Sequence, residues 1–178
     1  MIPKEYIQTY KKETGKHLQN VKVSFENFNL IEAIEKAAKS IDPTNENKMF
    51  SHQRRVGQIV AKKGYEALKD REKELQLNQS FEEILAITDE VSKQIYRLGS
   101  LWSYDTALRI GFQKKVYPKN VYLQAGVKKG YKKIFNQNPK NRFVDKEFFP
   151  KELQILKPYE IENFLCIWGN DKQKNQSC

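Results

Sequence analysis

The stretch QIYRLGSLWSYDTALRIG, residues 94–111, decides the fold because one helical pattern ends in it and another begins. Apolar residues at helical spacing run up to Ile95, stop at Arg97-Leu98-Gly99 and restart at Leu101. Such a break is either a plain connector between two helices or a turn that holds a phosphate group at the start of the second helix. The residues around the break are needed to choose between these two interpretations.

The helices on either side of the break have clear signals. Ser80 and Glu83 have the spacing of a capping box, which predicts a helix over 81–95. The second helix is expected over 101–113, and Ser100 is the candidate for its N-cap. The apolar face of this second helix is formed by Leu101, Tyr104, Leu108 and Phe112.

The rest of the chain also has mainly helical patterns. Four further helices are predicted, over 3–14, 30–41, 48–77 and 158–168. The stretch VKVSF, residues 21–25, alternates and fits one short strand, and a short helix is expected from Pro150. The chain has no internal repeat and no alternation of strands with helices. We therefore expect an all-α protein, a compact single-domain multi-helix bundle over 1–168 with a polar tail over 169–178.

The composition excludes several classes of protein. The 178 residues include two cysteines, Cys166 and Cys178, so neither a disulfide framework nor a metal site of paired Cys and His is expected. The N-terminal segment lacks the apolar core of a secretory signal, and no apolar run approaches the roughly 20 residues of a membrane span. We expect a soluble protein of the reducing cytoplasm that does not associate with a membrane, with no metal and no cofactor.

The positive charge is concentrated in one segment. The chain has 32 basic and 22 acidic residues, yet residues 106–144 contain ten basic residues and no Asp or Glu. The remainder, with 22 basic and 22 acidic residues, is neutral. Aromatic residues are interspersed in this acid-free segment, which is typical of a surface that binds a polyanion. The alternative is a solvated lysine-rich surface.

The break at Arg97-Leu98-Gly99 has much of the pattern of a helix-hairpin-helix turn. In that motif a Gly-hydrophobic-Gly turn joins two helices, and its backbone approaches a phosphate. Here Leu98 is the hydrophobic residue and Gly99 is the second glycine, while Arg97 replaces the first glycine and supplies a cation. Affinity at such a turn comes from backbone contacts and counterion release, so no preference for base sequence is expected.

A second candidate turn lies in LQAGVKKGYKKI, residues 123–134. Gly126 and Val127 match the start of the hairpin pattern, Lys128 stands where the second glycine would be, and Gly130 follows one turn later. The lysines that come next would line the start of a helix. The alternative for both turns is a plain helix–helix corner.

Over about 20–35 residues the chain resembles the helix-hairpin-helix superfamily of DNA-binding proteins. The stretches LGSLWSYDTALRIG and VYLQAG are also similar to uncharacterised bacterial proteins that carry such a segment. The resemblance implies binding to DNA without sequence preference, with a helix-hairpin-helix-like corner. The residues expected at the DNA are Arg97, Gly99, Arg109, Lys114, Lys115, Gly126, Lys128, Lys129, Gly130, Lys132 and Lys133.

The same superfamily includes base-excision DNA glycosylases. Those enzymes resemble each other in an Asp roughly twenty residues beyond the hairpin and, in bifunctional members, a Lys just after it. In this chain the Lys position falls near Leu101 after the first turn and near Gly130 after the second, where Lys129 is adjacent. Asp145 lies a few residues early for the Asp. Asp105 and Asp145 are the candidate catalytic residues if the chain is an enzyme of this type.

Asp105 has a structural interpretation as well. It lies four residues before Arg109, which is the favourable order for an ion pair within a helix. The functional alternative is that Asp105 is a carboxylate held beside Tyr104, where it acts as an acid/base group or as a lock for the hairpin.

Three other side chains have open interpretations. His52 either joins an anion-binding surface or lies on the solvated face of the helix over 48–77. Tyr117 and Tyr131 are the best candidates to stack on unpaired bases, although most aromatic residues of the segment are expected in the core.

Three classes of function remain open on this evidence. The first is a nucleic-acid-binding module that contacts the phosphate backbone through residues 106–144. The second is a glycosylase-like enzyme. The third is a protein-interaction or inhibitor module, for instance in phage defence, whose basic face binds an acidic protein partner.

Overall fold

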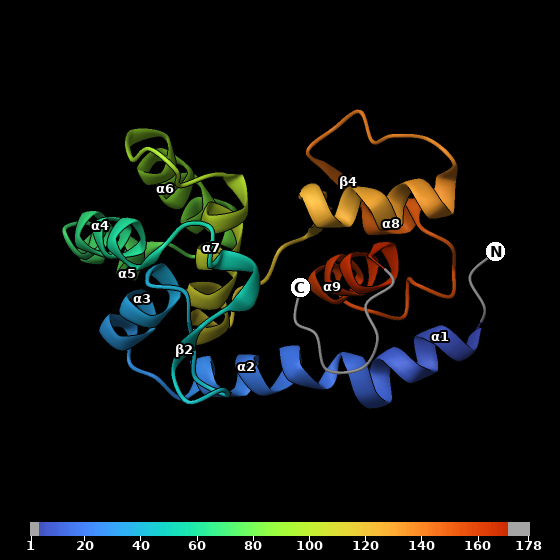
Figure 1. Cartoon of the computed structure of the whole chain (residues 1–178), viewed down its shortest axis with the longest axis horizontal. Helices are drawn as coiled ribbons and strands as arrows, with labels where there is room; N and C mark the ends of the chain where they lie inside the picture. Colours follow the sequence, from blue (N-terminus) through green and yellow to red (C-terminus); the bar gives the residue numbers. More distant parts are fainter. Residues whose placement is uncertain (1–3, 171–178) are drawn as a thin grey trace. The chain divides into compact units, whose positions relative to one another are not determined.

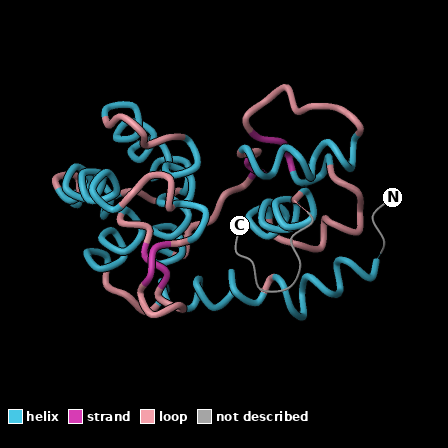
Figure 2. Tube along the Cα trace, viewed as in Figure 1, coloured by secondary structure: helices cyan, strands magenta, loops and turns pink. Residues whose placement is uncertain are grey.

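The computed structural model describes residues 4–170, and these residues are mostly helical (Figures 1 and 2). They form nine α-helices and two small antiparallel sheets of two strands each, which confirms the expected all-α fold class. Contacts divide the chain into two compact units: unit 1 has residues 1–19 and 118–178, and unit 2 has residues 20–117. The domain bounds expected from the sequence stay a prediction, and residues 171–178 of the expected tail lie outside the described part.

Unit 2 is built from helices and one short sheet. Its elements are the end of α2 (Lys16–Glu26), α3 (Leu30–Ala38), β1 (Ile41–Asp42), β2 (Lys48–Met49), the 3-10 turn η2 (Ser51–Gln53), α4 (Gln58–Lys69), α5 (Glu72–Leu77), α6 (Phe81–Gln94) and α7 (Ser100–Lys114). The capping box of Ser80 and Glu83 is confirmed at the start of α6. Asn29 caps α3, since its side chain accepts a hydrogen bond from the Glu32 backbone N–H at 2.9 Å.

Helix α7 lies at the centre of unit 2 and is buried on more than one side. The indole Nε1 of Trp102 donates a hydrogen bond to the Ala38 carbonyl oxygen at 2.9 Å, and Tyr104 packs edge-on against Phe81. A Cβ placed on Gly64 of α4 would lie 2.6 Å from the Trp102 ring, so glycine allows α4 to approach. The sequence predicted one apolar face for this helix, whereas the helix packs against both α3 and α6.

The prediction of one long helix over 48–77 is wrong. Strand β2, turn η2 and the separate helices α4 and α5 occupy this stretch. Gly57 precedes α4 with a φ of 82°, a left-handed conformation that glycine adopts without steric cost but that a continuous helix does not contain. The apolar spacing was therefore satisfied by two shorter helices that follow a non-helical connector.

Two local predictions are also wrong. Residues 21–25 lie in α2 rather than in a strand, and Val21 and Phe25, four residues apart, are both buried. The chain after Pro150 forms turns instead of a helix, with the Leu153 backbone N–H donating to the Pro150 carbonyl oxygen at 2.8 Å. Alternation and apolar content over five residues do not distinguish a strand from one side of a helix.

Unit 1 combines helices with a second short sheet. Its elements are α1 (Lys4–Thr9), the π-helical turn η1 (Tyr10–Thr14), the start of α2, β3 (Asn120–Tyr122), α8 (Ala125–Phe135), β4 (Phe143–Asp145), the 3-10 turn η3 (Lys146–Phe148) and α9 (Pro158–Gly169). Strands β3 and β4 pair antiparallel with Val121 opposite Val144. One apolar core joins α1, β3, α8 and α9, and the Tyr10 hydroxyl donates to Asn163 Oδ1 at 3.1 Å.

Helices α8 and α9 cross through glycines. A Cβ built on Gly130 would collide with the Leu165 carbonyl oxygen, and one built on Gly169 would collide with the Gly130 backbone. The two backbones therefore approach as closely as their atoms allow. This crossing fixes which side of α8 faces the core of unit 1.

Two further observations concern the possibility of a membrane span and the cysteines. Within residues 4–170, the helices are too short or too polar to cross a bilayer. Cys166 lies on α9, and the other cysteine, Cys178, lies outside the described residues, so the expectation that the chain has no disulfide framework stays a prediction.

Candidate nucleic-acid interface

The turn between α6 and α7 contains the first candidate hairpin. Leu98 is buried, and its backbone N–H donates to the Ile95 carbonyl oxygen at 3.1 Å. Arg97 has a φ of 75°, a left-handed conformation that costs a non-glycine residue roughly 1–2 kcal/mol. The backbone at position 97 is thus one that glycine would adopt easily, although the side chain is arginine.

Gly99, in contrast, occupies a position that other residues would tolerate. Its backbone is extended, with φ −120° and ψ −177°, and a Cβ there would meet no atom within 4 Å. Gly99 is the N-cap of α7 and Ser100 is the first residue of the helix, so the prediction that Ser100 is the cap is wrong.

A pocket of about 450 Å³ lies beside the start of α7. Its lining includes His52, Arg55 and Arg97, and Arg97 Nη2 donates to the Arg55 carbonyl oxygen at 2.5 Å. Unpaired N–H groups at a helix start and nearby guanidinium groups both attract anions. This placement supports the predicted role of Arg97 at a phosphate, which stays a prediction.

Asp105 on α7 is the centre of a polar cluster in unit 2, which we call the Asp105 cluster: Asp105, His52, Gln53 and Arg109. Its Oδ2 accepts a hydrogen bond from Gln53 Nε2 at 2.6 Å and lies 2.8 Å from His52 Nε2 and 3.6 Å from Arg109 Nη2. The Asp105 side chain is only 13% exposed. Burial raises the pKa of this carboxyl, but attraction to His52 and Arg109 and the hydrogen bonds outweigh burial, so its pKa is lowered.

The Asp105 cluster connects η2 to α7. The predicted ion pair between Asp105 and Arg109 is present, while the role of His52 and Gln53 was missed because the expected helix over 48–77 placed His52 on a solvated face. Among the described residues, His52 Nδ1 and Arg109 Nη1 are buried without a hydrogen-bond partner. With so little exposed surface, the cluster has the arrangement of a structural lock.

Arg109 is placed in the interior of unit 2. The residue is 5% exposed, and its guanidinium lies over the Phe50 ring at 3.9 Å from the ring centroid. Burial lowers the pKa of Arg109, while attraction to Asp105 and Asp42 opposes that change. The expected contact between Arg109 and DNA gains no support, because the side chain does not reach the surface.

The end of α7 carries two of the expected DNA-binding lysines. Lys114 Nζ donates to the Gln76 carbonyl oxygen at 2.7 Å, and burial lowers the pKa of this lysine. Lys115 follows the helix in a left-handed conformation, with φ 57°, and is exposed. Lys115 is therefore the more accessible of the two.

The second candidate hairpin is not a turn. Gly126, Val127 and Lys128 lie inside α8, which follows strand β3 rather than another helix. A Cβ on Gly126 would lie 2.9 Å from Cys166 Sγ, and Gly130 is in the crossing with α9. These glycines serve the packing of two helices, and the prediction that they approach a phosphate is not supported.

The lysines of α8 form the main accessible part of the acid-free segment. Seven of its ten basic residues fall in unit 1, and all seven are exposed: Lys119, Lys128, Lys129, Lys132, Lys133, Lys140 and Arg142. The four lysines on α8 form two adjacent rows with a spacing of four residues, Lys128 with Lys132 and Lys129 with Lys133. This spacing places them on neighbouring parts of one helix face. We call Lys128, Lys129, Lys132 and Lys133 the α8 basic face.

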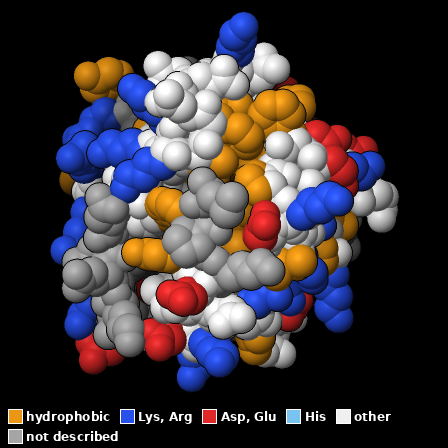
Figure 3. Space-filling model, turned by 90° about the vertical axis from the view of Figure 1, so that its right-hand side faces the viewer, with side chains coloured by type: hydrophobic (Ala, Val, Ile, Leu, Met, Phe, Trp, Pro, Cys, Tyr) orange, Lys and Arg blue, Asp and Glu red, His pale blue; other side chains and the backbone are white. Residues whose placement is uncertain are grey.

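The α8 basic face belongs to the unit with most of the net charge. Unit 1 has 16 basic and 8 acidic residues, whereas unit 2 has 16 basic and 14 acidic residues. Lys133 Nζ also donates to the Trp168 carbonyl oxygen at 3.1 Å, at the end of α9. Figure 3 shows one face of the molecule, on which Lys and Arg side chains lie at several places, with a group of them along the left-hand edge.

Neither tyrosine that was expected to stack on bases has a freely exposed ring. Tyr131 is 4% exposed and packs against Phe135 and Phe149 in the core of unit 1. Tyr117 is half-buried, and its hydroxyl donates to Glu26 Oε1 at 3.1 Å. Stacking on bases at these two positions therefore gains no support.

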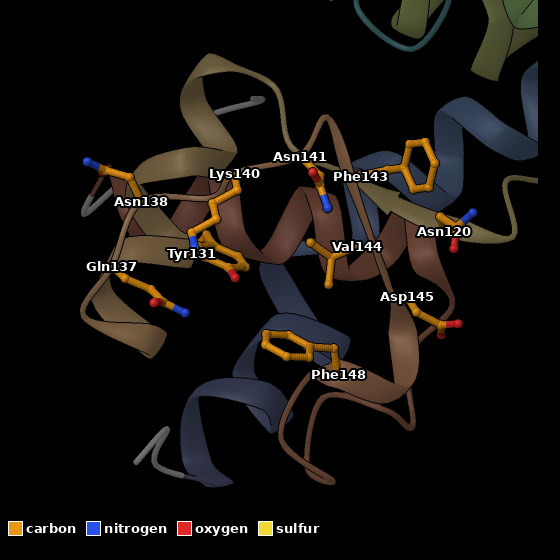
Figure 4. A pocket seen from close by; sticks show the side chains of 10 residues that line it. All are labelled: Asn120, Tyr131, Gln137, Asn138, Lys140, Asn141, Phe143, Val144, Asp145 and Phe148. Atoms are coloured by element: carbon orange, nitrogen blue, oxygen red, sulfur yellow. The ribbon is translucent and has the colours of Figure 1, made fainter.

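Asp145 lies at the end of β4 and is exposed. Its Oδ1 accepts a hydrogen bond from the Glu147 backbone N–H at 3.1 Å, and hydrogen bonding with Glu147 lowers the pKa of Asp145. Asp145 and Lys140 both line a pocket of about 540 Å³ in unit 1. Figure 4 shows these two residues on opposite sides of the hollow.

The described residues form a mostly helical protein with an exposed basic face and pockets that are lined by charged side chains. Comparisons with protein-family models, with curated proteins and with solved structures find no match to this chain. The resemblance to the helix-hairpin-helix superfamily thus stays a prediction. In the part of the chain that the structure describes, no group of three or more His, Cys, Asp or Glu side chains is arranged to hold a metal ion.

Proposed function

We propose that this protein binds nucleic acid through the phosphate backbone and that the α8 basic face is the main contact surface. The observation that carries the proposal is the set of seven exposed basic residues in unit 1 within a segment that has no carboxylate. Basic side chains that neutralise phosphates release condensed counterions, which supplies most of the affinity in binding without sequence preference.

The chemistry of this face favours contact with phosphates over recognition of bases. Its four cations are lysines, which act as point charges on flexible stems and lack the planar fork with which arginine reads guanine. Their spacing on two rows of α8 extends the charge along the helix. The pocket with Arg55 and Arg97 beside α7 is a second candidate contact, in unit 2.

Binding should depend steeply on salt and only weakly on base sequence. If six of the seven exposed basic residues each neutralise one phosphate, the affinity falls about a thousandfold between about 50 and 200 mM salt. Fluorescence anisotropy with labelled strands and duplexes of two unrelated sequences, titrated at several salt concentrations, measures this slope. If the protein binds neither strand nor duplex at the lowest salt concentration, the proposal is wrong.

An acidic protein partner is the competing explanation of the same surface. The absorbance ratio at 260 and 280 nm of protein purified at low salt separates the two explanations. Nucleic acid that co-purifies raises this ratio, whereas an acidic protein that co-purifies leaves it near the value of pure protein.

A glycosylase-like enzyme is the second candidate function, because Asp145 and Lys140 line one pocket. If it is correct, duplexes with damaged bases acquire abasic sites, and Asp145→Asn slows this reaction by at least about a hundredfold. Glu152→Gln, a change at another carboxylate of unit 1, is the matched control. If wild-type protein forms no abasic sites, this candidate fails while the binding proposal stands.

A further inference from the structure

Unit 1 contains a pocket with a distinctive set of polar side chains. Its volume of about 540 Å³ lies in the range of roughly 300–1,000 Å³ that is common for small-ligand sites. The start of β3, the connector over 136–142, β4 and η3 contribute to its lining (Figure 4). Four of the lining residues are amides, so we call it the amide pocket: Asn120, Gln137, Asn138 and Asn141.

The four amide side chains are available to a ligand. Within residues 4–170, none of them makes a side-chain hydrogen bond to another residue. A primary amide offers two donor hydrogens and one acceptor oxygen in a plane. This planar combination matches the edge of a nucleobase, which also presents donors and acceptors side by side.

The amide pocket also has aromatic surface for stacking. Phe148 is 55% exposed, yet its ring is held against Phe135, with centroids 5.1 Å apart and planes inclined at 36°. Figure 4 shows Phe148, Tyr131 and Val144 around the hollow. An aromatic ring that is already held in place loses little conformational freedom when a base stacks on it.

The charges on the pocket give a bound nucleotide an orientation. Lys140 and Asp145 lie on opposite sides of the hollow in Figure 4. A phosphate is attracted toward Lys140 and repelled from Asp145, while a carboxylate accepts a hydrogen bond from the exocyclic amine of a base. The base is therefore expected in the pocket, and the strand is expected to leave on the lysine side.

We propose that the amide pocket takes one unpaired nucleobase of a nucleic-acid strand, stacked on Phe148 and hydrogen-bonded by the amides. This proposal rests on the proposed function, and it names single-stranded or unpaired nucleic acid as the preferred substrate. The α8 basic face supplies affinity for phosphates that any strand or duplex offers. The pocket adds affinity that only an accessible base provides.

The test compares a short labelled single strand with the same strand in which the bases are replaced by abasic sites. Full-length protein is titrated into each at one fixed salt concentration, and anisotropy gives the two dissociation constants. Loss of the bases weakens binding at least about fivefold, since one stacked base contributes that much or more. Phe148→Ala weakens binding of the normal strand by a similar factor and leaves binding of the abasic strand unchanged.

Two more variants make the test specific. Asn141→Ala, at an exposed position of the connector, weakens binding to the normal strand without touching the aromatic stack. Ile155→Ala removes another exposed apolar side chain of unit 1 outside the pocket and leaves both dissociation constants unchanged. Free nucleoside monophosphates displace the strand only at a large excess, because they lack the contacts to the α8 basic face.

The outcomes separate this proposal from the proposed function. Equal affinity for normal and abasic strands, with Phe148→Ala and Asn141→Ala without effect, overturns the base-binding pocket while salt-dependent binding stands. Displacement of the strand by equimolar nucleoside monophosphate also overturns it, in favour of a free nucleotide as ligand. If neither strand binds at low salt, both proposals fail.

Discussion

Replacing Asp105 by Ala should lower the free energy of unfolding by about 3 kcal/mol. The substitution leaves the buried guanidinium of Arg109 without its carboxylate and removes the hydrogen-bond acceptor of Gln53 and the contact of His52. Removing one partner of a buried charge pair is costly because the other charge stays in a poorly solvated place. Urea unfolding followed by far-UV circular dichroism measures the change, which corresponds to a midpoint roughly 6–12 °C lower on heating.

Two control variants show whether the carboxylate itself is responsible. Asp105→Asn retains the shape and one acceptor but removes the charge, and its loss of stability should be smaller than that of Asp105→Ala. Glu66→Ala removes an exposed carboxylate from α4 in the same unit and should change stability by less than about 0.5 kcal/mol. If Asp105→Ala is as stable as wild type, the Asp105 cluster is not a structural lock and its role must be sought at the adjoining pocket.

The difference in stability between wild type and Asp105→Asn should depend on pH. The pKa of Asp105 is lower in the folded protein than its ordinary value of 3.8. A carboxyl with a lowered pKa stabilises the folded state above its ordinary pKa, and this contribution is lost as pH falls through the folded-state pKa. The difference in stability between wild type and Asp105→Asn should therefore be constant near neutral pH and should shrink below about pH 4.

The Asp105 cluster also shows how far the sequence could lead. The pair of Asp105 and Arg109 follows from a spacing of four residues in a helix, as does the capping box of Ser80 and Glu83 from a spacing of three. His52 and Gln53 lie more than fifty residues before Asp105, and no local pattern connects them. Their position depends on the connector that ends at Gly57. This connector could not be predicted, because apolar residues recur at helical spacing across it.

The sequence predicted the positive charge of the acid-free segment better than it predicted which of its basic residues are exposed. The acid-free segment was recognised from composition, and its lysines on α8 are exposed as expected. Arg109 is in the same segment but is buried, since α7 packs on more than one side and its long side chain lies over Phe50. The glycines of α8 show the same limit: the sequence pattern was interpreted as a turn that approaches a phosphate, whereas these glycines allow α9 to pack closely.

Reversing three charges of the α8 basic face should have the largest effect on binding. In the variant Lys128→Glu/Lys129→Glu/Lys132→Glu, three phosphate contacts are lost, so affinity for a duplex falls by at least about a thousandfold at about 50 mM salt. The slope of log affinity against log salt should decrease by about 2.7. Lys133 is kept because its amine donates to α9. Glutamates at positions 128 and 129 near the start of α8 complement the helix dipole, whereas a glutamate at position 132 in the last turn opposes it at a cost of about 0.3–1 kcal/mol, so far-UV circular dichroism is used to check that the variant is folded.

A second triple variant separates the location of the charge from its amount. Lys62→Glu/Lys63→Glu/Lys69→Glu makes the same change in net charge at exposed positions of α4, in unit 2. Because the α8 basic face is unchanged in this variant and keeps its phosphate contacts, the variant should lose less than about tenfold in affinity. If both triple variants lose affinity equally, the total charge rather than the α8 basic face governs binding. If the α8 variant binds duplex as well as wild type does, α8 is not the contact, and the pocket beside the start of α7 becomes the next surface to test.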